Sequence, residues 1–282
     1  MTKPRILFMG TPAFAVPALQ GLVRGGWPVI GVVTQPDRPQ GRGRATASPP
    51  VKVIAEDLGL PVLQPEKVRN QDFLDTFRTL APDLVVVSAF GQILPGEIIH
   101  GPREGCINIH PSLLPKYRGA APINRALIRG EETTGVTIMR MDEGVDSGAI
   151  LLQEETPIGP EETFGELHDR LAILGAEMLI KTLEMLAAGT VRPKPQDHNL
   201  ATLAPRLDRE AGLIHWDNDC REIVSLIRDS LPSPAPTHFW MGKSSRFLRP
   251  RRNWSPLRRR RELSPGRRPA RFASQQGMVM CS

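Results

Sequence analysis

Two polar residues, Asn108 and His110, alternate with apolar residues at the end of a short run, Cys106-Ile-Asn108-Ile-His110. The run predicts a buried strand, and because successive strand residues point to opposite faces, Asn108 and His110 share one face. An amide donor and an imidazole that can take up a proton near neutral pH can together hold a carbonyl oxygen as it becomes an oxyanion. The pair therefore indicates chemistry at a carbonyl carbon, although a single His beside a strand is more often a hydrogen-bonded core or loop residue.

An acidic turn follows a later apolar run, in the sequence Met141-Asp-Glu-Gly-Val-Asp-Ser-Gly148. Its three carboxylates belong to Asp142, Glu143 and Asp146. Taken alone, such a turn is a solvated loop or a cation site with few ligands. Because no other carboxylate-rich pattern supports a cation, no metal is expected.

A basic stretch with several Gly and Pro runs from Thr34 to Lys52. Its cations are Arg38, Arg42, Arg44 and Lys52, and Asp37 is the only opposing charge. A flexible cationic loop of this kind suits the phosphates and unpaired bases of a nucleic acid. A mobile surface loop with incidental arginines explains the same residues equally well.

The elements that must position these residues form an alternating pattern. The apolar runs that predict strands are Arg5–Met9, Val29–Val33, Asp83–Ala89, Cys106–Ile109 and Gly135–Met141. Helix-compatible segments separate them, and the uniformly apolar runs indicate strands that are buried on both faces, so a parallel, doubly wound α/β sheet is predicted. Ligand sites of such sheets lie at the carboxyl ends of the strands, where Asn108 and His110 stand.

The turn after the first strand bears on cofactor use. Gly10-Thr-Pro-Ala-Phe-Ala-Val-Pro17 lacks the Gly-x-Gly-x-x-Gly pattern that lets a backbone approach a dinucleotide pyrophosphate. This argues against a nicotinamide-dependent oxidoreductase. The turn is interpreted as a tight entry into a helix, with a substrate-contacting loop as the alternative.

The second half of the chain predicts one long helix and then a change of character. Leu and Met recur at helical spacing over Glu161–Ala188, and Gly189–Pro205 is polar and contains Pro, as connections between domains do. A strand over Gly212–Trp216 and a helix over Cys220–Asp229 are predicted to open a second unit. After about residue 230 the alternation of apolar and polar residues fails, which predicts disorder.

The net charge of the 282-residue chain is +6, which suggests a nucleic-acid partner. Residues 246–282 hold eleven Arg and one acidic residue, Glu262, so this tail carries +10 and residues 1–245 carry −4.

No segment approaches the ~20 apolar residues of a membrane span, and the N-terminus has no signal-peptide pattern. We therefore expect a cytoplasmic monomer that does not associate with membranes.

The motifs taken together resemble a known family. N-x-H-P-S-L-L-P-x-Y-R-G at 108–119, followed by D-x-G-x-D-S-G at 142–148, is similar to the folate-dependent formyltransferases over roughly residues 3–230. The resemblance implies a Rossmann-like formyltransferase domain over residues 1–189, a linker over 190–206, and a C-terminal β-barrel of the oligonucleotide-binding (OB) type over 207–282. The barrel resemblance is lost after about 232–245, where an Arg/Pro/Ser/Trp mixture is typical of a GC-rich coding region read out of frame. A genuine basic tail that attracts tRNA is the alternative.

The resemblance also implies an activity, the transfer of a formyl group from 10-formyltetrahydrofolate to an amine. The opening F-M-G-T-P-x-F-A-V-P and the basic insert resemble the branch that formylates methionine on initiator methionyl-tRNA. In that branch Asn108 and His110 hold the formyl oxygen and Asp146 orients His110 or takes up protons through water. The residues implied to hold the reduced pterin are Ser112, Leu113, Leu114 and Pro115, and Arg38, Arg42, Arg44 and Lys52 are implied to contact tRNA. The alternatives are a formyltransferase for a small amine or nucleotide sugar, and a tRNA-binding remnant with impaired activity.

Overall fold

A computed structural model describes residues 3–40, 45–208 and 210–230 of the chain. These residues belong to one compact unit that spans residues 1–239. The predicted tRNA contacts Arg42 and Arg44 lie outside the described residues. So does most of the predicted barrel, because residues 231–282 are not described.

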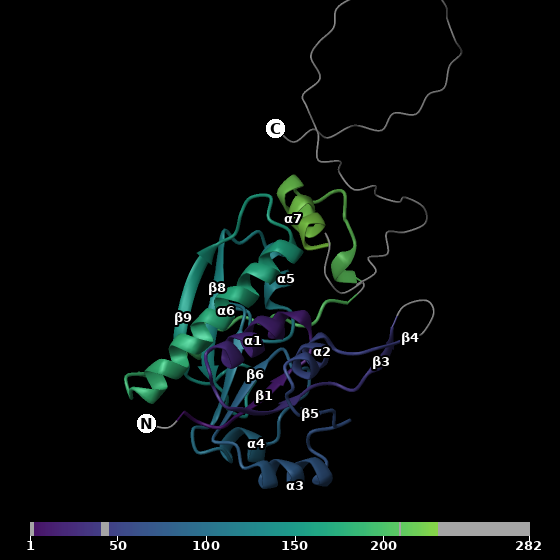
Figure 1. Cartoon of the computed structure of the whole chain (residues 1–282). Coiled ribbons are helices and arrows are strands. Elements are labelled where there is room, and N and C mark those ends of the chain that lie inside the picture. The colour runs from purple at the N-terminus through teal and green to yellow at the C-terminus, as the bar shows by residue number, and fades with distance from the viewer. Residues whose placement is uncertain (1–2, 41–44, 209, 231–282) are drawn as a thin grey trace, which may run out of the picture. The chain divides into compact units, whose positions relative to one another are not determined.

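A seven-stranded sheet forms the centre of this unit, in the order β5-β2-β1-β6-β7-β8-β9 (Figure 1). The strands are β1 (Ile6–Gly10), β2 (Val29–Val33), β5 (Val62–Leu63), β6 (Leu84–Ser88), β7 (Cys106–His110), β8 (Thr133–Arg140) and β9 (Ile150–Pro157). The five strands from β5 to β7 pair in parallel. A separate hairpin pairs β3 (Arg38–Gln40) with β4 (Ala45–Ala47) within the basic stretch.

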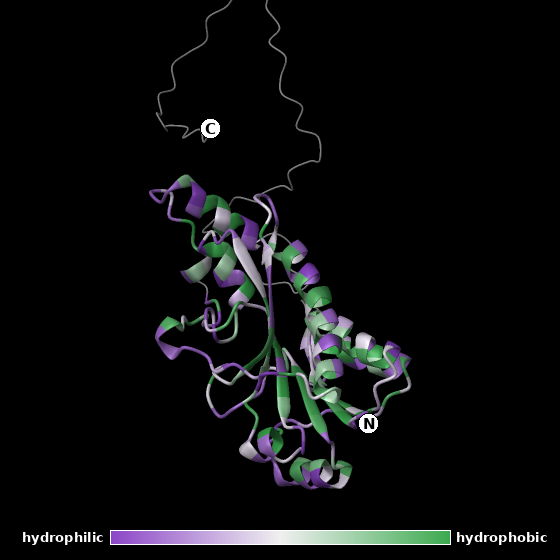
Figure 2. Ribbon diagram, turned by 90° about the vertical axis from the view of Figure 1, so that its left-hand side faces the viewer, coloured by the Kyte–Doolittle hydropathy of each residue, from purple (hydrophilic) through white to green (hydrophobic). Residues whose placement is uncertain are grey.

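The uniformly apolar strands are buried on both faces, as the sequence predicts. In β1, Ile6 and Phe8 enter the hydrophobic cluster on one face of the sheet, while Leu7 and Met9 enter the cluster on the other. Alternate side chains of a strand point to opposite faces, so only a continuous apolar run can serve two cores at once. Figure 2 shows the hydrophobic colouring of these central strands between the flanking helices.

Helices cover both faces of the sheet. The first face carries α1 (Val16–Arg24), α2 (Pro50–Asp57), α5 (Pro122–Ile128) and α6 (Phe164–Ala187), and the second carries α3 (Gln71–Leu80) and α4 (Gly96–His100). The long helix α6 begins with a capping box. The Thr163 hydroxyl accepts a hydrogen bond from the Glu166 N–H, and the Glu166 carboxylate accepts one from the Thr163 N–H. The predicted helix over Glu161–Ala188 therefore starts three residues later, at Phe164.

The prediction of a parallel sheet is wrong for its last two strands. β8 runs antiparallel to β7, and β9 runs antiparallel to β8, so the sheet is mixed. The connection from β7 to β8 contains only the seven-residue helix α5. The β8 strand runs back from the carboxyl edge of the sheet, so that Thr137 lies opposite His110 and Arg140 lies opposite Ile107.

The segment after α6 differs from the prediction in one element. Gly212–Trp216 is not a strand, because a 3₁₀ turn over Glu210–Gly212 leads into irregular chain. The predicted helix is present as α7 (Cys220–Ser230). This helix packs against the unit through Asp229, which accepts a hydrogen bond from Asn124 of α5 at 2.7 Å. Within the described part of the chain, no helix combines the length and apolarity needed to cross a membrane.

Candidate active site

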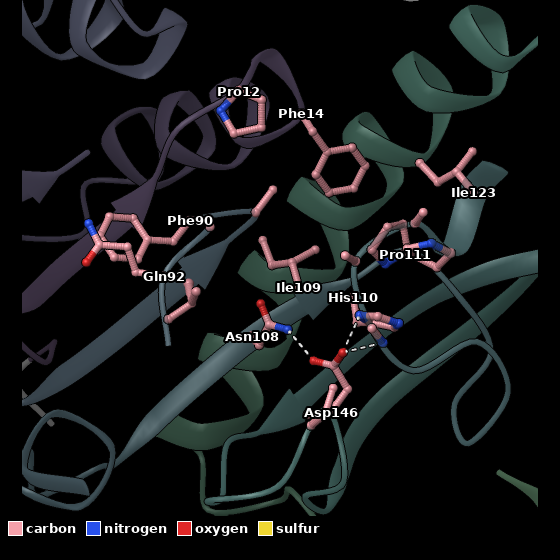
Figure 3. Close-up of a pocket in the computed structure, with 18 of the residues that line it drawn as sticks. Pro12, Phe14, Phe90, Gln92, Asn108, Ile109, His110, Pro111, Ile123 and Asp146 are labelled. Carbon is pink, nitrogen blue, oxygen red and sulfur yellow. Dashed lines mark hydrogen bonds and ion pairs between the residues drawn. The ribbon is translucent and has the colours of Figure 1, made fainter. Parts of the chain in front are cut away.

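A cavity of about 570 Å³ opens at the carboxyl ends of β6 and β7 (Figure 3). The segment Ala89–Leu94, which follows β6, lines one wall, and Figure 3 shows Phe14 and Ile123 across from its Phe90 and Gln92. Other lining residues are Met141, Val145, Pro122, Phe164 and His168. Asn108, His110 and Asp146 also line it, so the polar groups belong to a largely apolar cavity. This is the sheet edge at which the sequence predicts a site.

The structure brings Asn108, His110 and Asp146 together. Asn108 and His110 come from β7, and Asp146 comes from the turn after β8. The Asn108 amide Nδ2 donates to Asp146 Oδ1 at 3.4 Å, and His110 Nδ1 lies 3.6 Å from Asp146 Oδ2. Figure 3 shows both side chains directed at the carboxylate. Both nitrogens therefore converge on the same carboxylate, one on each of its oxygens.

The orientation of the His110 ring follows from its second contact. Nε2 lies 2.9 Å from the backbone carbonyl of Tyr117. Because a carbonyl oxygen only accepts, Nε2 carries a hydrogen, and Nδ1 is the nitrogen that faces Asp146. The imidazole is buried. The loop that contains Tyr117 also contacts the Asp146 carboxylate, because the Gly119 N–H donates to Asp146 Oδ2 at 2.8 Å.

The three carboxylates of the acidic turn have separate partners. Asp142 Oδ1 accepts from the Gly144 N–H and from the Ser147 hydroxyl, which closes the turn. Glu143 pairs with His100 at 2.6 Å, and this hydrogen bond holds the pKa of Glu143 below its usual value. Of the three, Asp146 is the carboxylate that lines the cavity. In the described residues, no three His, Cys, Asp or Glu side chains are grouped as metal ligands would be.

The residues predicted to hold the pterin, Ser112, Leu113, Leu114 and Pro115, lie behind His110. Thr137 of β8 donates to the Ser112 carbonyl at 2.6 Å and accepts from the Leu114 N–H at 3.2 Å. The Ser112 and Leu114 side chains are buried. The lining of the cavity includes the preceding residue, Pro111, rather than these four. Their role in binding folate stays a prediction.

Two parts of the cavity were not identified from the sequence. The segment Ala89–Leu94 follows a predicted buried strand, so its place at the carboxyl edge was available as a signal. Within it Ile93 is 94% exposed, which leaves a large apolar side chain at the mouth of the cavity. On the other wall, the Phe14 and His168 rings meet edge to face, with centroids 5.4 Å apart. Nothing in the local sequence pattern pairs these two residues.

The predicted tRNA contacts that the structure describes, Arg38 and Lys52, are both paired with acids. Arg38 lies 3.5 Å from Glu66, and both side chains are exposed. Lys52 lies 2.7 Å from Asp37, and this hydrogen bond is the main cause of the lowered pKa of Asp37. An exposed pair such as Arg38–Glu66 contributes little stability, so the Arg38 cation remains available to a phosphate.

Fold and site together match one family. Residues 4–183 match the formyl transferase family, so the chain belongs to that family. The chain is 54% identical to a methionyl-tRNA formyltransferase of Syntrophus aciditrophicus, over 88% of this chain and 80% of that protein. It is 50% identical to the methionyl-tRNA formyltransferase of Acetivibrio thermocellus, over 85% of this chain and 77% of that protein.

Solved structures of N-formyltransferases have the same fold. An N-formyltransferase from Helicobacter canadensis in complex with folinic acid and dTDP-3-aminofucose superposes with a TM-score of 0.60 at 19% identity, over 79% of each chain. A sugar N-formyltransferase from Shewanella gives a TM-score of 0.62 at 24% identity, over 79% of this chain and 87% of that one. At these identities the similarity establishes the fold only.

Proposed function

We propose that the protein transfers the formyl group of 10-formyltetrahydrofolate to the α-amino group of methionine on initiator methionyl-tRNA. The observation that carries this proposal is the convergence of Asn108, His110 and Asp146 in the cavity at the carboxyl edge of the sheet. The relatives that share half of their residues with this chain, all named methionyl-tRNA formyltransferases, support methionyl-tRNA as the acceptor.

The acceptor sets the chemical task. A free α-amine titrates near pH ~7.7, and esterification of the carboxyl group lowers this value, so much of the amine is already unprotonated at neutral pH. Strong base catalysis is therefore not the main requirement. The site must instead position the amine and stabilise the oxyanion that forms when it attacks the formyl carbon.

The three polar residues can divide this task. As the amine nitrogen bonds to the formyl carbon, the Asn108 amide and a proton on His110 Nδ1 donate to the developing oxyanion. Asp146, 3.6 Å from that Nδ1, stabilises the imidazolium and takes the proton of the attacking amine through water. The tetrahedral intermediate then collapses, the bond to the folate nitrogen breaks, and that nitrogen gains, through water, the proton that Asp146 took from the amine.

The folate requires an apolar wall for its ring system. We place it against the segment Ala89–Leu94, whose exposed Ile93 stands at the mouth of the cavity. Ser112–Pro115 would support the same site from behind, through the Thr137 hydrogen bonds that fix the loop after His110. The opposite wall, with Phe14 and His168, is then left for the aminoacyl group.

The rest of the assignment concerns tRNA contact and domain layout. The basic stretch that contains Arg38, Arg42, Arg44 and Lys52 would contact the acceptor end of the tRNA. We further propose that residues 1–189 are the catalytic domain, that 190–206 are the linker, and that 207–282 are a tRNA-binding OB-like barrel that is disrupted after about 232–245. The genomic DNA read in the neighbouring frame tests the disruption.

A cytoplasmic monomer is the proposed active form, which sedimentation of the purified chain tests.

One assay separates the proposed function from its alternatives. The chain is incubated with 10-formyltetrahydrofolate and charged initiator tRNA, and in parallel with uncharged tRNA and with small amines or nucleotide amino sugars. Formyl-methionine on the charged tRNA alone supports the proposal. Formyl transfer to a small amine without tRNA would indicate the sugar-type activity. Binding of tRNA without any transfer would indicate a remnant that has lost turnover.

A further inference from the structure

Gln196 is a buried residue in a segment that the sequence predicts to be a simple connection. Its neighbours from Arg192 to Asn199 are exposed, whereas the Gln196 residue is only 6% exposed. The chain is fixed just before it, because Ile150 of β9 and Lys194 exchange two backbone hydrogen bonds of 2.8 Å. Gln196 is thereby directed toward the turn that carries Asp146.

The amide of Gln196 uses its full hydrogen-bonding capacity. Its Nε2 donates to the backbone carbonyls of Asp146 at 2.9 Å and of Gly148 at 2.7 Å. Its Oε1 accepts from Arg118 Nε at 3.1 Å and from Arg118 Nη2 at 2.7 Å. A guanidinium only donates and a carbonyl only accepts, so the two ends of the amide are assigned without ambiguity.

These contacts act where the backbone is strained. Asp146 has φ 47°, a left-handed conformation that a residue other than Gly keeps only where its surroundings hold it. The carboxylate is held by Gly119 and Asn108. The carbonyl of the same residue is held by Gln196. Releasing that carbonyl lets the turn relax, and the carboxylate then moves relative to His110.

The same segment also holds the loop on the other side of the site. The Arg118 N–H donates to the Thr202 carbonyl at 2.8 Å, and the Ala204 N–H donates to the Arg118 carbonyl at 2.7 Å. This loop supplies the Tyr117 carbonyl to His110 and the Gly119 N–H to Asp146. Arg118 therefore links Gln196 to both halves of the site.

We propose that Gln196 is a positioning residue for Asp146, which acts by holding the Asp146 and Gly148 carbonyls through its amide nitrogen. The consequence for turnover rests on the proposed function, whereas the consequence for the position of the carboxylate does not. Neither the motifs of the sequence nor the lining of the cavity includes Gln196. Of the residues that line the cavity, Asp146 is the one with which Gln196 forms a hydrogen bond.

Two substitutions separate the two ends of the amide. Gln196→Glu keeps an oxygen that accepts from Arg118 but loses both donors to the carbonyls. Gln196→Met has a similar length and loses every hydrogen bond. The matched control is Asn199→Ala, which removes an exposed side chain three residues away in the same segment.

The kinetic readout is the division between kcat and KM for formylation of methionyl-tRNA. Both Gln196 variants should lose about tenfold or more in kcat, which corresponds to misplacement of one catalytic group, while both KM values stay within about twofold. The control should match the wild type. A wild-type kcat in Gln196→Glu, or a raised KM with unchanged kcat, would overturn the proposal.

A second readout needs no substrate. The Gly119 N–H donates to the Asp146 carboxylate at 2.8 Å, so its NMR resonance reports where that carboxylate stands. In both Gln196 variants this resonance should move upfield and the amide should exchange faster with solvent, with no change in Asn199→Ala. An unchanged Gly119 resonance in a folded Gln196→Glu would refute the positioning role. If the wild type does not formylate methionyl-tRNA, the proposed function fails and this measurement still decides the role of Gln196.

Discussion

Replacing Gly119 with Ala tests how tightly the Asp146 carboxylate depends on the loop that faces it. Gly119 has φ 117°, a conformation that L residues rarely adopt, and its N–H donates to Asp146. A Cβ at this position would lie 2.9 Å from the Ala204 carbonyl oxygen, which belongs to the backbone and cannot rotate away. The substitution therefore strains the backbone and pushes two paired segments apart.

The expected magnitude has two parts. The unfavourable φ alone costs about 1–3 kcal/mol of folding free energy, and the displaced Ala204 carbonyl adds to it. A hydrogen bond to a charged group contributes about 1.5–3 kcal/mol. If that energy is lost only in the transition state, in which Asp146 must be aligned, kcat falls by about one to two orders of magnitude.

A second glycine provides the control. Gly59, just after α2, also has a positive φ of 67°, but a Cβ there meets no atom within 4 Å. Gly59→Ala should cost about 1–2 kcal/mol of stability and leave kcat unchanged. Urea unfolding gives the stability of each variant, and methionyl-tRNA formylation gives its kcat. If Gly119→Ala turns over like Gly59→Ala, the link from this loop to catalysis is refuted.

Three further changes test other parts of the molecule. Asn108→Ala or His110→Ala should lower kcat by about two orders of magnitude, since one oxyanion donor contributes about 3 kcal/mol, and near wild-type turnover of both would exclude the assigned roles. Burial raises the pKa of Asp229 to about 6, so its carboxyl group stabilises the fold in acid and this contribution is lost as pH rises through about 6. Asp229→Asn keeps the oxygen that accepts from Asn124 and should raise the unfolding free energy by about 1–3 kcal/mol at about pH 8. At about pH 4 it should change little, and equal effects at both pH values in urea unfolding would contradict this. Arg42→Ala should weaken tRNA binding and flatten its salt dependence, and an unchanged salt slope would count against that contact.

Individual strands of the sheet could be predicted from the sequence. Apolar runs such as Leu84–Ser88 predict buried strands because only such runs serve two cores. That pattern does not determine the direction of a strand, so the antiparallel return of β8 could not be predicted from it. The run Gly212–Trp216 resembled a strand, but no neighbouring strand pairs with it in the described residues.

The site likewise contains residues that could be predicted from the sequence and one that could not. Asn108 and His110 were predictable because their spacing of two places them on one face of one strand, and Asp146 was singled out by its motif. Gln196 was not, because a single amide within a polar stretch carries no periodic signal. Its importance arises only when the chain brings it to the Asp146 turn, fifty residues earlier in the sequence.

The pairing of Thr202–Ala204 with the Tyr117–Ala121 loop has a consequence for how such a protein can be assembled from parts. A gene fusion that joined a foreign module directly after α6 would remove the partners of Arg118 and the support of Asp146. A fusion after Pro205 would keep them all. The segment that ends at residue 205 is therefore needed to hold the site, whereas the chain beyond it contributes to the fold through the contact of α7 with α5.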